Sequence, residues 1–283
     1  NRGRVALAAQ ASGTIRLLLK QAVLYSGKRC TWGQPIRTRE LVLGRLGRMA
    51  AAQIVCEALS GWSAALIDDG RSGELEAILA KIIASRCLRQ VAIDALGIHG
   101  GRTFLVGPPL GDSFHDHFAA GIYEGESDLL GLALFKGIVK HHPLVSKRSF
   151  LDWIQWRISR SLQFFPPKED AALLDSELRS LAFQSRRNLV AASIEIDRLF
   201  RAYGRKLAEQ QLILADLSDR IQGFISCLAV IHYADRRADI DSLQAAACWC
   251  RSILLSCAGK ALVKGDYRRL ANLGRSCLHR FSA

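Results

Sequence analysis

Apolar residues recur at helical spacing along most of the chain, and this periodicity restricts the fold more than any other feature of the sequence. Between residues 4 and 28 they fall at every third or fourth position, which places them on one face of a helix. The same spacing predicts further helices over about 37–67, 74–98, 127–139, 170–201, 205–234, 240–261 and 266–280. No segment alternates apolar and polar residues as a half-buried strand does. The sequence therefore predicts an all-α protein of antiparallel helices.

Two breaks divide the predicted helices into groups. The segment "KHHPLVSK" (140–147) ends the first group, and "FFPPKED" (164–170) precedes the second. We therefore expect an antiparallel four-helix-bundle domain over residues 1–140, a linker with an amphipathic segment over 141–168, and an additional helical domain over 169–283.

The chain of 283 residues starts with Asn1, not Met, directly inside the first predicted helix. We interpret it as a piece of a longer protein. Because 49% of its residues are hydrophobic, it can build a sizeable core. No uninterrupted apolar run reaches the roughly 18–20 residues that cross a bilayer, and no signal peptide is visible.

The formal net charge of +13 is spread over the chain. Residues 1–143 carry +5 and residues 144–283 carry +8, without a run of five or six like charges. Such a surface attracts polyanions, anionic lipids or a nucleotide-bearing substrate. A simply solvated basic surface explains the charge equally well, and a nucleic-acid-binding protein is favoured by charge alone.

The cysteines and histidines do not form a metal-binding pattern. The eight cysteines lie mostly within apolar helical segments, no C-x-x-C pair occurs, and Cys248-Trp249-Cys250 has the wrong spacing for a zinc knuckle. We expect buried, reduced thiols in a reducing compartment. His99, His115 and His117 lie close in sequence but lack a helix-borne H-x-x-x-H, so no metal site is predicted.

Three ordered motifs resemble a known family. The opening "NRGRVALAAQASGTIRLLLKQAVLYSGKRCTWGQPI" resembles the start of the C-terminal helical domain of acyl-CoA dehydrogenases, including its Y-x-x-x-R-x-x-F-G motif. "DALGIHGGRTF" (94–104) resembles the glycine loop of the family, and "IYEGESDLL" (122–130) resembles its I-Y-E-G segment. The resemblance covers residues 1 to about 140. Residues 205–231 are more loosely similar to the extra C-terminal region of the very-long-chain branch.

The resemblance implies a reaction. In that family, a carboxylate removes the α-proton of an acyl-CoA thioester while a hydride passes from the β-carbon to a flavin. Glu124 matches this catalytic base, and burial of a carboxyl raises its pKa and strengthens it as a base. Gly125 lets the backbone pass close to a substrate. The alternative reading makes Glu124 a favourable charge at the start of the next helix, worth about 0.3–1 kcal/mol.

The resemblance also implies binding residues and partners. Arg29 matches an arginine that reaches FAD phosphates across a subunit interface, a role that suits its forked guanidinium. The expected cofactor-binding residues are Arg29, Trp32, Gly97, Gly100, Gly101, Glu126 and Asp128. The expected substrate-binding residues are Asn1, Arg4, Tyr123 and Gly125. Trp32 reads equally as a core aromatic, and Arg4 as a surface charge. The implied partners are FAD, a fatty acyl-CoA, an electron-transfer flavoprotein and a second copy of the chain.

The sequence departs from the family pattern at four positions. Gly97 replaces a Gln that opens the glycine loop, and Glu126 replaces a Thr that lies against the flavin. Leu43 replaces a Gln of the second helix, and His115 replaces an Arg. A second carboxylate near a pyrophosphate is repulsive. A catalytically impaired homologue that acts as an assembly or scaffold protein is therefore an open alternative.

The segment 150–165 carries aromatic residues on one side and arginines on another. Such a segment can lie on an anionic membrane surface or pack against the main bundle. Peripheral membrane contact is accordingly an expectation for this region. The compartment implied by the resemblance is the cytoplasm of a bacterium, or the mitochondrial matrix or inner membrane of a eukaryote.

Overall fold

The computed structural model describes residues 1–105, 109–112, 114–140, 142, 155 and 172–281. The predicted amphipathic segment 150–165 lies outside these residues, apart from Gln155. The elements in chain order are α1 (Arg2–Lys28), β1 (Cys30–Thr31), β2 (Gln34–Pro35), η1 (Ile36–Thr38), α2 (Glu40–Asp68), α3 (Glu74–His99), η2 (Gly100–Phe104), α4 (Pro109–Asp112), α5 (Asp116–Ala119), α6 (Ser127–Val139), α9 (Ser176–Tyr203), η3 (Gly204–Glu209), α10 (Gln211–Arg237), α11 (Ile240–Cys257) and α12 (Lys264–Phe281).

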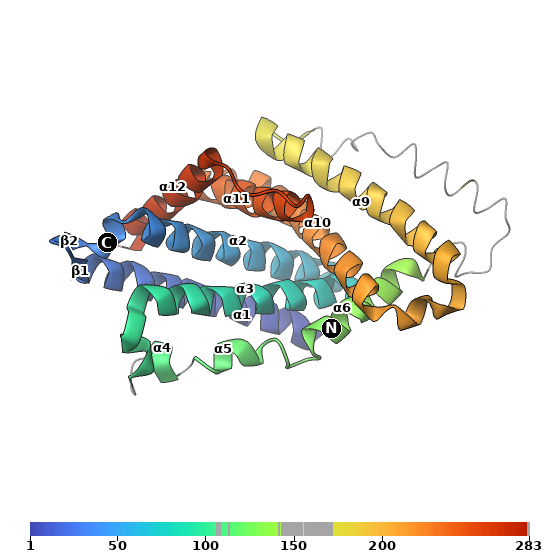
Figure 1. The fold of residues 1–283 in the computed structure, drawn as a ribbon, viewed down its shortest axis with the longest axis horizontal. Coiled ribbons are helices and arrows are strands. Elements are labelled where there is room, and N and C mark those ends of the chain that lie inside the picture. The colour runs from blue at the N-terminus through green and yellow to red at the C-terminus, as the bar shows by residue number, and fades with distance from the viewer. Residues whose placement is uncertain (106–108, 113, 141, 143–154, 156–171, 282–283) are drawn as a thin grey trace.

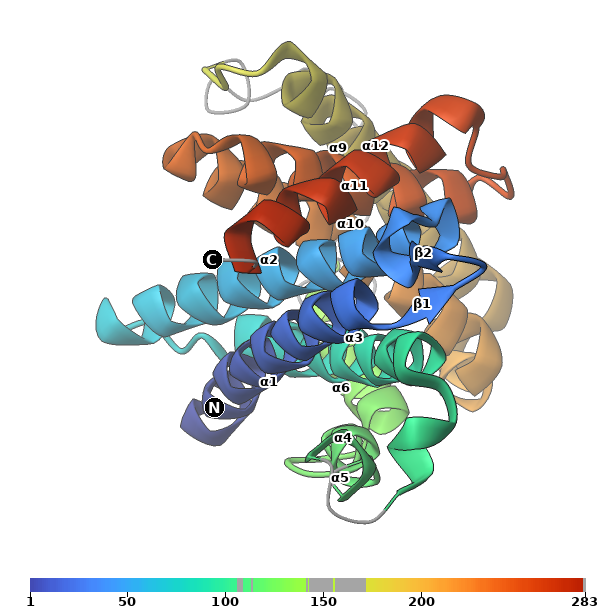
Figure 2. The same cartoon turned by 90° about the vertical axis from the view of Figure 1, so that its left-hand side faces the viewer.

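Helices dominate the structure, which confirms the predicted all-α class (Figure 1). Helix α1 packs along α2 and α3, and α6 packs against α3 and α10. In both views, α11 and α12 lie on the side of α2 that faces away from α1 (Figures 1 and 2). Helix α2 is thus enclosed by helices from both halves of the chain.

The crossing of α2 and α12 depends on two glycines. A Cβ atom at Gly47 of α2 would overlap the carbonyl oxygen of Leu270 in α12. A Cβ atom at Gly274 of α12 would overlap the carbonyl oxygen of Leu43 in α2. Because neither residue has a side chain, the two backbones approach closely, and α12 is fixed against the first half of the chain.

One hydrophobic cluster runs through both halves of the chain. It joins buried residues of α1, α2 and α3 to residues of α10, α11 and α12, such as Ile15, Leu59, Ile83, Val230 and Leu273. A smaller cluster lies between α6, α9, η3 and α10. The proposed domain boundary at 141–168 falls almost wholly outside the described residues, so the division into domains stays a prediction.

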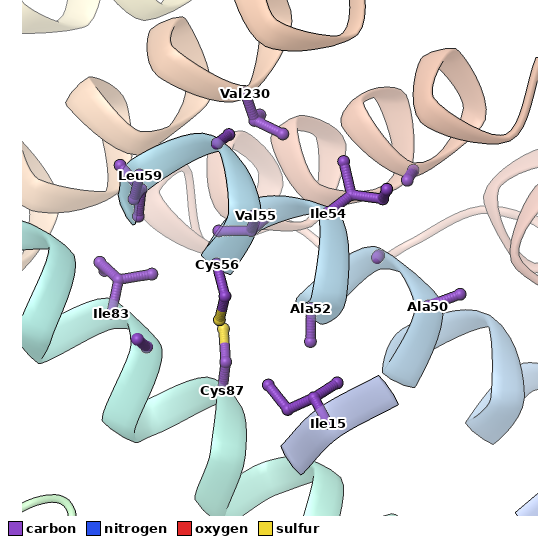
Figure 3. Packing of buried hydrophobic residues seen from close by; sticks show 14 of the residues in the cluster. Ile15, Ala50, Ala52, Ile54, Val55, Cys56, Leu59, Ile83, Cys87 and Val230 are labelled. Atoms are coloured by element: carbon purple, nitrogen blue, oxygen red, sulfur yellow. The ribbon is translucent and has the colours of Figure 1, made fainter. Parts of the chain in front are cut away.

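Cysteines are part of this core. Cys56 of α2 and Cys87 of α3 are buried, and their thiols point toward each other (Figure 3). The neighbouring Cys87 thiol and burial raise the pKa of Cys56 well above its ordinary value. The protonated thiol is poorly nucleophilic, so this pair contributes to the packing of the core and not to chemistry. All eight cysteines are free thiols in the structure.

Several predicted boundaries shift for local reasons. The helix expected over 205–234 begins at Gln211, because Gly204–Glu209 forms a 3-10 turn instead. The helix expected over 170–201 begins at Ser176, where the Asp175 side chain accepts a hydrogen bond from the Leu178 amide. The turn expected at 31–36 is a short antiparallel hairpin in which Cys30 pairs with Pro35.

Helix α2 is long and apolar enough to cross a membrane by length and composition, alone among the helices of the described residues. Buried residues make up 61% of its most apolar window. Its neighbours in the bundle account for that burial, as expected of a central core helix.

Candidate functional site

The loop between α5 and α6 has an uncommon backbone. Glu124 has φ +60° and Gly125 has φ +106°, so consecutive residues adopt left-handed conformations. Glycine tolerates such angles, but a residue with a Cβ atom pays a steric cost in this region. Surrounding contacts must therefore hold Glu124 in place, and such strain is concentrated at functional sites.

Lys81 of α3 supplies the main contacts to this loop. Its side chain is fully buried, and its ammonium group donates hydrogen bonds to the carbonyl of Gly121 at 2.9 Å and to the carbonyl of Gly125. A third bond reaches the Ser127 hydroxyl at 3.2 Å. Burial lowers the pKa of Lys81 from its ordinary value of 10.5, and the Glu126 carboxylate opposes this shift. The loop is thereby tied to α3 on both sides of Glu124.

Helix α1 supports the loop from a second side. The Arg4 side chain donates a hydrogen bond from Nε to the Glu124 carbonyl at 3.3 Å. The Glu124 carboxylate lies against Gly3, where a Cβ atom would be 2.5 Å from Oε1. Asn1 points elsewhere and donates to the Ser72 carbonyl at 3.1 Å. The Glu124 carboxylate lies at the first turn of α1, and the residue is exposed in this chain, so the expected burial of the base is not found among the described residues.

Glu126, and not Glu124, caps helix α6. Its Oε2 atom accepts hydrogen bonds from the amides of Asp128 at 2.9 Å and Leu129 at 3.0 Å. These backbone bonds, that of Leu129 first, lower the pKa of Glu126 from its ordinary value of 4.5. Asp128 forms an ion pair with Arg86 at 3.6 Å. The capping role considered for Glu124 therefore belongs to Glu126.

A cavity of about 410 Å³ lies beside the loop. Its walls include Leu7, Gln10 and Thr14 of α1 together with Asp116, His117 and Tyr123. This volume is within the range of small-molecule sites, which is about 300–1,000 Å³. Tyr123 lines this space, which can hold part of a ligand, whereas the next residue, Glu124, is not part of the lining.

His117 is a polar group in the wall of this cavity. The side chain is 6% exposed, and its Nε2 atom has no hydrogen-bond partner among the described residues. Burial lowers the pKa of His117 from its ordinary value of 6.5, and the neighbouring Asp116 carboxylate opposes the shift. The imidazole is therefore neutral at physiological pH, and its Nε2 atom has hydrogen-bonding capacity that the protein itself does not use.

A second group of predicted residues lies at the other end of α1. Arg29 follows the last residue of that helix, and the exposed Trp32 follows in the hairpin with φ +52°. The Arg39 guanidinium lies 4.6 Å from the centre of the Trp32 ring. The prediction of Trp32 as a core aromatic is wrong, because its side chain is 89% exposed. The indole is stacked with a cation at the surface.

The glycine loop joins this second group. Tyr25 of α1 and His99 of α3 stack with their ring centres 4.6 Å apart, which brings the end of α3 to the end of α1. Gly100 has φ +62°, and a Cβ atom at Gly100 or Gly101 would meet open space. At Gly97 a Cβ atom would instead overlap the guanidinium of Arg45. A side chain at position 97 would therefore require the Arg45 guanidinium to move.

The predicted site residues thus form two separate groups (Figure 1). The group at the start of α1 holds Asn1, Arg4, Tyr123, Glu124, Gly125, Glu126 and Asp128. The group at its end holds Arg29, Trp32, Gly97, Gly100 and Gly101. Helix α1 has 27 residues, which at a rise of about 1.5 Å per residue span about 40 Å. One bound ligand does not bridge that distance within a single chain.

Two residues of this region, Lys81 and His117, were not among the site residues predicted from the sequence. Lys81 is the single charge inside the apolar run "AILAKIIAS" (77–85), and a buried charge in such a run requires partners. That signal was available in the sequence. No group of three metal-ligating side chains occurs in the described parts of the chain.

The first half of the chain thus combines an all-helical fold with a strained, carboxylate-bearing loop at one end of a long helix and a glycine-rich loop at the other. Residues 1–138 match the family model described as "Acyl-CoA dehydrogenase, C-terminal domain". This part of the chain belongs to the acyl-CoA dehydrogenase family.

Curated relatives agree with this assignment. The human very long-chain specific acyl-CoA dehydrogenase of mitochondria is 31% identical over 133 residues, which is 47% of this chain and 20% of that protein. The acyl-CoA dehydrogenase FadE10 of Mycobacterium tuberculosis is 29% identical over 153 residues, covering 50% of this chain and 24% of that protein. The matches therefore span only about a fifth to a quarter of these relatives.

Solved structures share the fold over nearly the whole chain. An acyl-CoA dehydrogenase complexed with FAD from Bacillus anthracis gives a TM-score of 0.78 at 15% identity, over 99% of this chain and 56% of that one. Acyl-CoA oxidase-2 of Caenorhabditis elegans, bound with FAD, ascaroside-CoA and ATP, gives 0.70 at 14% identity, over 99% and 47%. At these identities the likeness concerns the fold, which dehydrogenases and oxidases share.

Proposed function

We propose that the chain is the C-terminal part of an FAD-dependent acyl-CoA dehydrogenase that oxidises long-chain fatty acyl-CoA in fatty-acid β-oxidation. The observation that carries this proposal is Glu124 itself. The loop that holds this residue in a left-handed conformation is tied down by Lys81 and Arg4, and the preceding residue, Tyr123, lines a cavity of about 410 Å³. A carboxylate fixed at such a position can act as a base on a substrate that enters the cavity.

In this mechanism the Glu124 carboxylate removes the α-proton of the acyl thioester. Lys81 and Arg4 position the base, because each donates a hydrogen bond to the main chain of its loop. Tyr123 lines the cavity and can contact a ligand there. When FAD is bound, it supplies the acceptor for the hydride.

The second group of residues fits a phosphate-bearing ligand such as FAD. Arg29 is exposed, the backbone around Gly100 and Gly101 is open, and no Cβ atom closes the approach. A guanidinium can donate two hydrogen bonds to a phosphate, and backbone without Cβ atoms lets a phosphate approach closely. Glu126 and Asp128 belong to the other group, so the predicted cofactor residues serve two different flavins. This separation supports a homodimer in which Arg29 serves the flavin of the neighbouring subunit.

Finer parts of the proposal follow the family. They are a preference for very long acyl chains, electron transfer to an electron-transfer flavoprotein, and a location in a bacterial cytoplasm or mitochondrial matrix. Peripheral membrane contact through residues 144–283, with the amphipathic segment 150–165, belongs to the same proposal. We also propose that the chain alone does not turn over substrate, because it matches only about a fifth to a quarter of the length of its relatives and so supplies only part of the flavin and substrate sites.

Replacement of Glu124 in the complete protein tests the catalytic role. Glu124→Gln should retain bound flavin yet lose its bleaching by palmitoyl-CoA under anaerobic conditions, a loss of about a thousandfold or more in rate. Glu209→Gln is the control, because this exposed carboxylate on η3 belongs to neither group of site residues and should leave bleaching within about tenfold of the wild type. Normal bleaching by the Glu124 variant would refute the assignment.

A catalytically impaired homologue with an assembly role is the second candidate. The Arg45 guanidinium occupies the space beside Gly97, where the family pattern has a glutamine side chain. This change favours altered cofactor contacts at that end of α3. A complete protein that purifies without flavin and does not bind added FAD would support this candidate over the enzyme.

A further inference from the structure

A second cavity lies on the opposite side of α2 and α3 from α1. Its volume is about 470 Å³, and its walls come from α2, α3, α10, α11 and α12. It therefore occupies the junction between the family-matched half of the chain and the helices that follow. Glu124 and its loop take no part in its lining.

The interior of this cavity is mainly apolar. Small side chains of α2 leave the space open, and larger apolar and aromatic side chains close it. The main apolar lining residues are Ala51, Ala52, Val91, Trp249, Ile253 and Leu270. The Trp249 N–H group is already used, since it donates to the Ser226 hydroxyl at 3.0 Å. The indole thus presents its ring to the cavity and favours an apolar ligand body.

The charged residues of the cavity are mostly paired with each other. Arg48 binds Asp94 through two hydrogen bonds, of 3.0 and 2.7 Å. Arg86 binds Asp219 at 3.0 Å. Arg251 pairs with Asp266, and Arg269 pairs with Glu177. These pairs neutralise four of the five arginines that line the cavity.

Arg89 is the exception among the described residues of the lining. It is exposed on α3, and no ion pair or hydrogen bond of its guanidinium occurs among the described residues. One unpaired guanidinium at the edge of an apolar space selects a ligand with a single anionic head. A polyphosphate is disfavoured, because the other four arginines of the lining are already paired with carboxylates and a single guanidinium is left to bind several negative charges.

We propose that this cavity is a binding site for an amphipathic monoanion, a long-chain monocarboxylate, with the carboxylate at Arg89 and the alkyl chain against Trp249. Such a ligand touches helices from both halves of the chain. Its binding therefore stabilises their packing and raises the unfolding temperature. The proposal does not depend on the catalytic role of Glu124.

Binding measurements on the 283-residue chain test the proposal without any substitution. Laurate, kept below its micelle-forming concentration, should bind with a saturable change in tryptophan fluorescence and raise the unfolding temperature. Butyrate should bind at least about tenfold more weakly, because it buries far less apolar surface. Dodecanol should bind about two- to fivefold more weakly than laurate, since it lacks the charge. ATP should not compete with laurate.

Substitutions and labelling locate the site. Arg89→Ala should weaken laurate about two- to fivefold and leave dodecanol unchanged, whereas Arg16→Ala, a control at an exposed position of α1, should change neither. Ala52→Phe should fill the cavity and abolish binding of both ligands. A photoreactive diazirine analogue of laurate should label peptides that contain Trp249 or Tyr267.

Three outcomes would overturn the proposal, and the first two require no variant to fold. The first is laurate binding no tighter than dodecanol or butyrate. The second is ATP displacing laurate, or labelling confined to peptides outside the lining of the cavity. The third is an Arg89→Ala variant that folds and binds laurate as tightly as the wild type.

Discussion

The ammonium group of Lys81 lies 2.9 Å from the carbonyl oxygen of Gly121, and this hydrogen bond links α3 to a loop that is 40 residues further along the chain. The same group also reaches Gly125, on the other side of Glu124. The position of the proposed base is therefore set by a residue that is itself fully buried.

Replacement of Lys81 by Met should loosen this loop. The carbonyls of Gly121 and Gly125 would lose their buried donor, which costs roughly 1–3 kcal/mol for each unsatisfied group. We expect hydrogen exchange of the amides at 122–127 to accelerate at least about tenfold. Lys136→Met is the control, because that lysine is exposed on α6. Equal exchange in both variants would show that Lys81 does not hold the loop.

Substitutions at Glu124 should report its left-handed backbone. Glu124→Gly should be more stable than Glu124→Ala by about 1 kcal/mol, because only glycine adopts φ +60° without a steric cost. Urea unfolding of the two variants measures the difference. If the alanine variant proves equally or more stable, the loop does not have this conformation in solution.

The cap at Glu126 should be sensitive to pH. Loss of the cap in Glu126→Ala should cost about 1 kcal/mol at pH 7. The folded-state pKa of Glu126 is lowered from 4.5, so its stabilisation is fully present above that pH and is lost as the pH falls through the folded-state pKa. Denaturant titrations at pH 7 and pH 3 should give a difference between the variant and the wild type that shrinks at pH 3.

Folding stability should also depend on pH through His117, because its imidazole is buried in the neutral form. Its folded-state pKa is below 6.5, so the unfolded chain takes up the proton first, and stability falls as the pH drops below about that value. His117→Leu should remove this dependence and raise stability at pH 7 by about 1 kcal/mol, since it removes an unsatisfied buried nitrogen. Unfolding curves of variant and wild type between pH 7.5 and 5 that fall in parallel would contradict the prediction.

Two glycines of α2 should respond in opposite directions to the same change. Gly44→Ala should stabilise the protein by up to about 1 kcal/mol, because a Cβ atom there meets open space and alanine favours the helix. Gly47→Ala should cost at least about 2 kcal/mol, because the methyl group would overlap the Leu270 carbonyl and separate α12 from α2. Thermal unfolding of both variants gives the comparison.

The helices were predictable because their cores repeat at a regular spacing. The first predicted helix, 4–28, corresponds to α1 at Arg2–Lys28. The ends of helices depend on single caps and turns, which apolar periodicity does not predict. Examples are the Asp175 cap at the start of α9 and the 3-10 turn Gly204–Glu209 before α10. The close approach of α2 and α12 at Gly47 was not predictable, because a glycine within a helix does not indicate which other helix will pack against it.

The flanking sequence motif identified the loop that carries Glu124. It did not identify the residues that hold this loop in place. The contacts of Lys81 and Arg4 join residues that are 40 and 120 positions away from their partners. Such pairings follow from the packing of whole helices and are not visible in local sequence. The choice of Glu126 as the cap of α6 was also missed, since both acids precede the helix and only the backbone turn decides between them.

The separation of Arg29 from Glu124 along α1 has a genetic consequence if the proposed homodimer forms. A subunit with Glu124→Gln and a subunit with Arg29→Ala would each be inactive as a pure dimer. In a hybrid of the two, one active site receives an intact glutamate from one subunit and an intact arginine from the other. Random mixing of equal amounts would then restore about a quarter of all sites. Two defective alleles expressed in one cell would therefore complement each other.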